Sequence, residues 1–254
     1  MNQQQELARH FASLHRKGEP LLLYNAWDAG SAKAIAEGGA RAIGTSSWAI
    51  AAAHGYQDGE SMPFDFAARI AGRIACSVAL PVTVDVEGGY SADPQACANN
   101  VSQLLDYGVV GINFEDRIVS GVGLYGIDAQ CERIAAIRSM AKVRDLPLFI
   151  NARTDLFFEP GVPPRERLAE AVRRAAAYAE AGASGIFVPG LVALDVIAEL
   201  AAAIALPLNV MTLPGIPEHR ALADAGVARI SHGPAPYLHA MKALHEAAEK
   251  ALAG

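Results

Sequence analysis

Short apolar runs alternate with longer amphipathic stretches along most of the chain. Four of the runs follow a Leu-Pro or Glu-Pro pair and end in polar residues, and four others follow a glycine that would end a helix. The two kinds of run interleave. We therefore expect eight strands, near residues 21–25, 40–45, 82–86, 110–115, 147–151, 185–189, 207–211 and 228–231.

The stretches between these runs resemble helices. Asp93 followed by Pro94 is a typical helix start, because the aspartate accepts free N–H groups and proline is tolerated in the first turn. The segments 94–107 and 164–181 are amphipathic. Eight such units can close on themselves, whereas an open doubly wound sheet usually stops at about five to seven strands. The pattern predicts an α/β protein with one domain over residues 1–254, a (β/α)₈ TIM-type barrel.

Composition agrees with a large buried core and small-molecule partners. Of the 254 residues, 52% are hydrophobic and 19% are charged, which excludes a disordered chain. The net charge of −6 comes without a basic cluster, so we expect no nucleic-acid partner and no membrane partner. The first twenty residues contain no apolar signal segment, and this favours a cytoplasmic location.

The three cysteines give no sign of a structural role. Cys76, Cys97 and Cys131 are odd in number and form no C-x-x-C pair, so neither a disulfide framework nor a zinc knuckle is indicated. We expect all three to be small buried or half-buried hydrophobic residues.

Acidic residues follow two neighbouring strands, at the end of a barrel where active sites are built. Asp85 and Glu87 are two apart on an extended segment, so both point to one face and repel each other. A cation between them would relieve the repulsion, and oxygen ligands without His or Cys favour Mg²⁺ or Mn²⁺. Glu115 can add a third oxygen, directly or through water. The alternative is that these acids only cap the helices that follow.

Arg153 ends the fifth predicted strand and faces the same mouth. Its guanidinium could bind a carboxylate or a phosphonate through two parallel hydrogen bonds. The alternative is an ion pair with Asp155 or Glu115.

Thr45, Ser46 and Ser47 offer hydroxyl and N–H donors at a turn after a strand, which suits an anionic oxygen. Ordinary turn chemistry is the alternative. The chain contains no phosphate loop, G-x-S-x-G elbow or H-E-x-x-H motif, so nucleotide chemistry and covalent serine catalysis are excluded. What remains is electrophilic catalysis, in which a metal polarises an oxo group and stabilises an enolate.

Five ordered motifs carry a resemblance to a known family. They are NAWDAGSAKAIAEGGARAIGTSS, GYQDG, VDVEGGY, GINFED and NARTD, each at the end of an expected strand. Together they resemble the isocitrate lyase and phosphoenolpyruvate mutase superfamily over roughly residues 20–240. The resemblance implies a barrel of Mg²⁺-dependent enzymes that make or break C–C or P–C bonds beside an oxo-acid enolate. It also implies a homo-oligomer, a dimer or tetramer whose subunits exchange C-terminal helices.

The resemblance assigns roles to particular side chains. It makes Asp85 the direct metal ligand. The residues that it assigns to the water ligands of the metal are Asp58, Glu87 and Glu115. The residues that it assigns to the substrate are Thr45, Ser46, Ser47, Arg153 and Asn209.

The loop after the fourth strand departs from the family. It reads DRIVSGVGLYGID, and it lacks both the Lys-Lys-Cys-Gly-His motif of isocitrate-type lyases and the Lys and Asn of the mutases. Pro189 stands where family mutases have a histidine. These differences disfavour isocitrate-type cleavage and phosphonopyruvate rearrangement. Decarboxylation needs less, because a metal and Arg153 would stabilise the enolate while water or a nearby acid delivers a proton.

The sequence therefore predicts a Mg²⁺-dependent (or Mn²⁺-dependent) lyase or decarboxylase of a small 2-oxo or 2-hydroxy (di)carboxylate, similar to oxaloacetate decarboxylase or to a C–C bond lyase. Its expected catalytic residues are Arg153, Asp58 and His232, the last as a proton donor or else as a simple rim histidine. Two alternatives stay open: a phosphonopyruvate hydrolase or phosphonomutase, and an oxo-acid-binding protein with little turnover.

Overall fold

Parallel strands form one nine-stranded sheet in the computed structural model, which describes residues 2–158 and 161–253. The order of the strands is β1-β9-β8-β7-β6-β5-β4-β3-β2. Their bounds are β1 Leu21–Leu23, β2 Asn25–Ala26, β3 Ile43–Thr45, β4 Val82–Asp85, β5 Gly111–Glu115, β6 Phe149–Arg153, β7 Gly185–Phe187, β8 Leu208–Met211 and β9 Arg229–Ser231.

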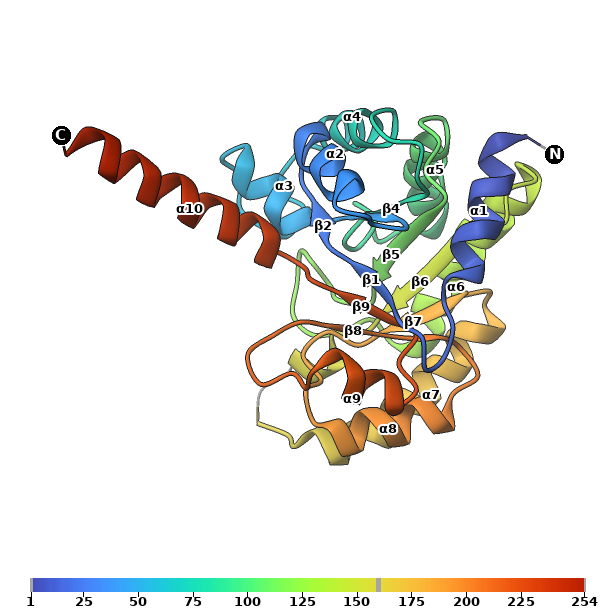
Figure 1. The fold of residues 1–254 in the computed structure, drawn as a ribbon. Helices are drawn as coiled ribbons and strands as arrows, with labels where there is room; N and C mark the ends of the chain where they lie inside the picture. The colour runs from blue at the N-terminus through green and yellow to red at the C-terminus, as the bar shows by residue number, and fades with distance from the viewer. Residues whose placement is uncertain (1, 159–160, 254) are drawn as a thin grey trace.

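The strands β1 and β2 are two halves of one extended segment that closes the sheet. Leu21 to Leu23 pair with β9, and Asn25 and Ala26 pair with β3. All eight strands predicted from the sequence are present, with the first one divided in two. The prediction of a (β/α)₈ barrel is confirmed (Figure 1).

Helices follow the strands as a barrel requires, and the last helix leaves the barrel. Figure 1 shows α10 projecting away from the other elements. The helices are α1 Gln3–Ser13, α2 Ala29–Glu37, α3 Ser47–Ala53, α4 Phe64–Ala75, α5 Pro94–Leu105, α6 Ile127–Val143, η1 Asp155–Phe158, α7 Pro164–Glu180, α8 Leu194–Ala203, α9 His219–Asp224 and α10 Ala235–Leu252.

The predicted helix starts have the expected chemistry. Asp93 caps α5, where its side chain accepts a hydrogen bond of 2.7 Å from the backbone of Ala96, and Pro94 is the first helical residue. The Ala/Arg/Glu-rich helix α7 begins at a second proline, Pro164. Both predicted helices are confirmed.

The helix α1 lies at the amino-terminal ends of β5 and β6. The amide of Gln4 donates to the carbonyls of Leu105 and Val109, at 2.8 and 3.1 Å. Phe11 is fully buried, and its ring lies 5.4 Å from that of Phe149. The apolar face of α1 therefore covers the end of the barrel opposite to the strand ends that carry the acidic residues.

The three cysteines are free, and one of them is not where the sequence suggested. Cys97 is buried and Cys131 is partly buried, as expected, but Cys76 is exposed. It caps the carboxyl end of α4, past the last buried turn of that helix. No helix in the described ranges is long and apolar enough to cross a membrane.

His15 follows α1 and stacks on Phe149 with ring centres 4.0 Å apart. Burial, reinforced by the charge of Arg229, lowers its pKa to about 3, against about 6.5 in an unfolded chain. The unfolded state therefore binds more protons between about pH 6.5 and 3, so the free energy of unfolding falls as pH falls through this window.

A His15→Phe variant keeps an aromatic ring on Phe149 and cannot be protonated. We expect the free energy of unfolding of the unaltered protein to drop by about 2 kcal/mol more than that of the variant between pH 7 and pH 5. Urea unfolding curves at both pH values measure this difference. Equal drops would show that His15 does not govern acid stability.

Candidate active site

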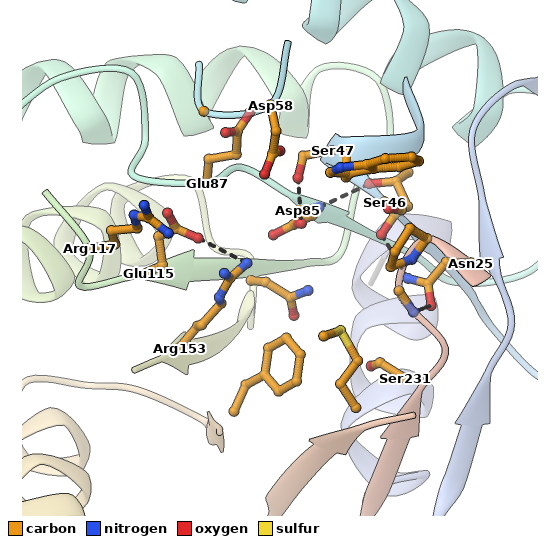
Figure 2. Close-up of a pocket in the computed structure, with 18 of the residues that line it drawn as sticks. Asn25, Ser46, Ser47, Asp58, Asp85, Glu87, Glu115, Arg117, Arg153 and Ser231 are labelled. Carbon is orange, nitrogen blue, oxygen red and sulfur yellow. Dashed lines mark hydrogen bonds and ion pairs between the residues drawn. The ribbon is translucent and has the colours of Figure 1, made fainter. Parts of the chain in front are cut away.

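A cavity of about 550 Å³ opens at the carboxyl ends of the strands (Figure 2). Its described charged lining residues are Asp58, Asp85, Glu87, Glu115, Arg117 and Arg153. Its described hydroxyl and amide residues are Asn25, Thr45, Ser46, Ser47, Asn113 and Ser231.

Asp85, the last residue of β4, has one oxygen held and one oxygen unsatisfied. The hydroxyl of Ser47 donates to Asp85 Oδ2 at 2.7 Å, and the backbone N–H of Asp85 donates to the hydroxyl of Thr45 at 2.9 Å. Asp85 Oδ1 is buried and accepts no hydrogen bond from any described residue. An unpaired carboxylate oxygen is costly unless a cation or a water meets it.

Glu87 is held by hydrogen bonds between two loops, one with Glu60 and one with Glu87 and Tyr90, whose backbone is strained at these residues. Glu60, Glu87 and Tyr90 all have positive φ angles, of 56°, 50° and 58°. The N–H of Glu60 donates to Glu87 Oε2 at 2.8 Å, and the N–H of Tyr90 donates to Glu60 Oε1 at 2.7 Å. A left-handed backbone conformation costs a non-glycine residue roughly 1–3 kcal/mol, and such residues cluster at functional sites. The surrounding contacts therefore hold these two loops in one conformation.

Burial and mutual repulsion raise the pKa values of three carboxyl groups. Burial and the nearby Asp85 raise the pKa of Glu87 to about 7. The same two causes raise the pKa of Asp58. Burial raises the pKa of Glu115 well above its usual range, in spite of the positive charge of Arg153. A cation among these groups would oppose all three shifts.

The carboxyl groups do not form a closed cage for a metal. No group of three or more His, Cys, Asp or Glu side chains in the described part of the chain is placed to hold an ion directly. Glu115 is engaged by Arg153 at 2.9 Å, and Glu87 by the N–H of Glu60. The donor set therefore fits Mg²⁺ with Asp85 as the direct ligand and the other acids contacting its waters, since Mg²⁺ usually keeps several waters.

Arg153 forms both of the ion pairs that the sequence left as alternatives. Its Nε and Nη2 donate to the two oxygens of Asp155 at 2.6 and 2.8 Å, and its Nη1 lies 2.9 Å from Glu115 Oε2. These contacts take three of the five N–H donors of the guanidinium. Arg153 is therefore held rigidly at the cavity wall, with two N–H groups left for a ligand.

Asp116 supports this arrangement from behind. Its Oδ2 accepts hydrogen bonds from Tyr178 at 2.8 Å and from Arg174 at 3.0 Å, and its Oδ1 accepts one from the N–H of Asp155 at 3.1 Å. The residue is fully buried and does not line the cavity. It fixes the backbone at the start of η1. This holds Asp155 in position, and Asp155 in turn holds the guanidinium of Arg153.

The three hydroxyl residues after β3 lie together at the cavity, but part of their capacity is already used. Ser46 caps α3, where its hydroxyl accepts a hydrogen bond from Ala49 N, and Thr45 accepts one from Asp85 N. The turn chemistry named as the alternative is therefore present. Ser47 links this turn to Asp85.

Two residues predicted for the site lie outside the cavity. Asn209 is buried one layer deeper, where it donates to the hydroxyl of Ser231 at 3.2 Å, and Met211 takes the place facing the cavity on β8. Side chains alternate along a strand, so Ser231 points inward and His232 points outward, with its ring 5.1 Å from that of Tyr24. Neither side chain lines the cavity, and their expected roles stay predictions.

Sequence reasoning missed Arg117, the first residue of the loop after Asp116. It lines the cavity, and its guanidinium makes no hydrogen bond or ion pair with a described residue. Its positive charge is a minor influence on Asp58, where it opposes the rise in pKa that burial and Asp85 cause. The signal was present in the sequence, because Arg117 is the cation of a loop, DRIVSGVGLYGID, that has no Lys or His.

Fold and site together define a (β/α)₈ barrel with an acidic cavity at its catalytic end. The family model for phosphoenolpyruvate phosphomutase matches residues 11–252. The chain therefore belongs to this family, as its motifs suggested.

Individual relatives cover most of the chain. It is 36% identical over 243 residues to an uncharacterized protein of Mycobacterium tuberculosis, with 94% of this chain and 87% of the relative covered. It is 31% identical over 190 residues to oxaloacetate decarboxylase of Bradyrhizobium sp., with 72% and 62% covered. A crystal structure from Burkholderia cenocepacia, provisionally named a phosphonomutase, is 44% identical with a TM-score of 0.95, and 98% of this chain and 99% of that chain are covered.

Proposed function

We propose that the protein is a divalent-metal-dependent enzyme that breaks a carbon–carbon bond in a small 2-oxo or 2-hydroxy acid, with decarboxylation of an oxaloacetate-like substrate as its leading reaction. The observation that carries this proposal is the unpartnered, buried Oδ1 of Asp85 among the carboxyl groups of Asp58, Glu87 and Glu115. The similarity to a Bradyrhizobium oxaloacetate decarboxylase supports the choice of reaction.

Asp85 would hold Mg²⁺ directly, and Asp58, Glu87 and Glu115 would hold its waters. A bound Mg²⁺ supplies positive charge beside the oxo group of the substrate, which stabilises the enolate formed when the neighbouring bond breaks. Four carboxyl groups and two guanidinium groups line the described cavity, so a divalent cation brings their formal charge to zero. A small anionic substrate can then enter.

The chain's own residues bind and orient the substrate. Arg153, with two N–H groups left, would bind an anionic oxygen of the substrate, while Ser47 keeps Asp85 in position (Figure 2). In decarboxylation the bond to the leaving carboxylate breaks, its electron pair stays on the carbon next to the carbonyl, and CO₂ departs. The enolate carbon then takes up a proton from solvent. The described lining residues include no His, Lys, Cys or Tyr, which favours a reaction that needs no dedicated acid.

Asp85→Asn keeps the shape and the contact with Ser47 but removes the charge. We expect it to weaken Mg²⁺ binding and to lower kcat/KM for oxaloacetate by at least about 100-fold, with little change in the metal-free melting temperature. Pyruvate formation and calorimetry measure this, with enzyme-free Mg²⁺ blanks.

The matched control is Asp65→Asn on the exposed face of α4, which should behave as the unaltered protein. Full activity of Asp85→Asn, or activity in EDTA, would contradict the proposal. Phosphate release from phosphonopyruvate with oxaloacetate untouched would assign P–C chemistry instead. Binding of 2-oxo acids without any turnover would indicate a binding protein.

Arg117 would bind the far carboxylate of the substrate. It is the described cavity cation without an ion-pair partner, whereas Arg153 is tied to Asp155 and Glu115. A guanidinium with free donors at the mouth suits a second anionic group. The proposed substrate is therefore a dicarboxylate.

Arg117→Gln should raise KM for oxaloacetate by about tenfold, the loss of one charged hydrogen bond, and leave inhibition by the monocarboxylate pyruvate unchanged. Steady-state kinetics with both compounds measure this. Arg9→Gln on the exposed side of α1 is the control. An equal effect on both compounds would show that Arg117 does not select for a second carboxylate.

The helix α10 would join two copies of the chain into a homo-oligomer. Its apolar residues Leu238 and Leu244 are 48% and 62% exposed. A groove of about 950 Å³ lies beside its base, over the outer side of β1, where Leu22 is 44% exposed. A barrel strand is normally covered by a helix there, and α10 of a second copy has the apolar residues to cover it.

Leu238→Asp combined with Leu244→Asp should convert a dimer or tetramer to a monomer, because each charge would have to be buried against the apolar groove. Light scattering after gel filtration gives the masses. Val143→Asp, at an 88% exposed position on α6, is the control and should assemble normally. A monomeric unaltered protein would contradict this assembly.

A further inference from the structure

Arg229 is a buried cation inside the barrel, one layer below the cavity. It lies on β9 and is fully buried. Its Nε donates to the hydroxyl of Ser231 and its Nη2 to Asn113 Oδ1, each at 3.1 Å. Its Nη1 is buried without a partner among the described residues. Burial lowers its pKa to about 9, so it stays charged at neutral pH.

A charged group in this position is costly, and no described carboxylate shares an ion pair with it. Burying an uncompensated charge is strongly unfavourable, so an arginine is retained in such a place only when something uses its charge or its donors. Its two described partners, Asn113 and Ser231, both line the cavity. The charge of Arg229 therefore acts on the floor of the active site.

Asn113 is oriented by its neighbours in one way only. Its Oδ1 accepts hydrogen bonds from both Arg229 and Asn151, at 3.1 and 3.0 Å, which fixes the oxygen toward the interior. Its Nδ2 donates to no described residue, and it is not fully buried, so it is accessible from the cavity. The amide nitrogen therefore faces the cavity with free N–H groups.

We propose that Asn113 Nδ2, held in place and polarised by Arg229, is an oxyanion-binding group on the cavity floor, which takes a carboxylate or enolate oxygen of the substrate. The inference rests on the proposed function for the identity of that anion. Asn113 touches the ligand, and Arg229 is a positioning residue that acts through it. A fixed dipole backed by a buried charge, in a site shielded from water, is well suited to stabilise developing negative charge.

Oxalate is the probe, because it carries the two adjacent carboxyl groups of an enolate mimic and needs no turnover. Asn113→Ser removes the amide without adding charge, and Asn113→Asp keeps both acceptors for Arg229 and Asn151 but loses the donor. At saturating Mg²⁺ we expect each variant to bind oxalate about tenfold more weakly by calorimetry, and the uncharged Asn113→Ser to keep its Mg²⁺ affinity within about twofold of the unaltered protein. Asn99→Asp, on the exposed side of α5, is the matched control and should bind normally.

The role of Arg229 is tested in both backgrounds. Arg229→Gln should weaken oxalate binding about tenfold in the unaltered chain and leave it unchanged in Asn113→Ser, since its effect passes through the amide. A merely structural role would weaken binding equally in both. If Arg229→Gln does not fold, the two Asn113 variants alone decide.

Oxalate binding within about twofold of the unaltered protein in folded Asn113→Ser would overturn the proposal, and so would failure of the unaltered protein to bind oxalate. These outcomes separate the inference from the proposed function. If the unaltered protein turns over no oxo acid but Asn113→Ser abolishes oxalate binding, the oxyanion site is supported and the proposed reaction is wrong. If the Asn113→Ser variant decarboxylates its substrate normally, the proposed reaction is supported and the oxyanion site is wrong.

Discussion

Repulsion among four carboxyl groups at one end of the barrel is the constraint on which the rest of the site depends. Asp58, Asp85, Glu87 and Glu115 line one cavity, and burial and proximity raise the pKa of three of them. Such a cluster is stable only with opposing charge. The chain supplies part of it through Arg153 at the wall, and Asp85 Oδ1 is left without a partner among the described residues.

The surrounding structure holds the four carboxyl groups close together in spite of their mutual repulsion. Arg153 is tied to Asp155, whose backbone is held by the buried Asp116. On the other side, Glu87 is held by the N–H of Glu60 in strained backbone. Both supports lie in loops after strands, which a barrel can vary without disturbing its core. The acids are thus fixed before any ligand arrives, so little reorganisation is needed on binding.

Much of the fold could be predicted from sequence because apolar runs and helix caps act locally, as Asp93 and Pro94 do at α5. The acids at the ends of β4 and β5 could also be located, since strand ends converge in a barrel. His232 could not be placed, because one residue along a strand decides between the inside and the outside. Asn209 does point into the barrel, but Met211, two residues further along β8, faces the cavity instead, and the strand pattern does not show which inward residue reaches the cavity. Arg229 and its contact with Asn113 join segments 116 residues apart, which no local pattern reveals.

The central claim is that Asp85 binds a divalent cation at the cavity. Crystals soaked with Mn²⁺ and oxalate, with diffraction recorded near the manganese absorption edge, test it most directly. The account predicts one strong anomalous peak at about 2.1–2.2 Å from Asp85 Oδ1, with waters between the metal and the other acids. A cavity without a peak, or a peak coordinated by other residues while Asp85 stays unbound, would contradict it.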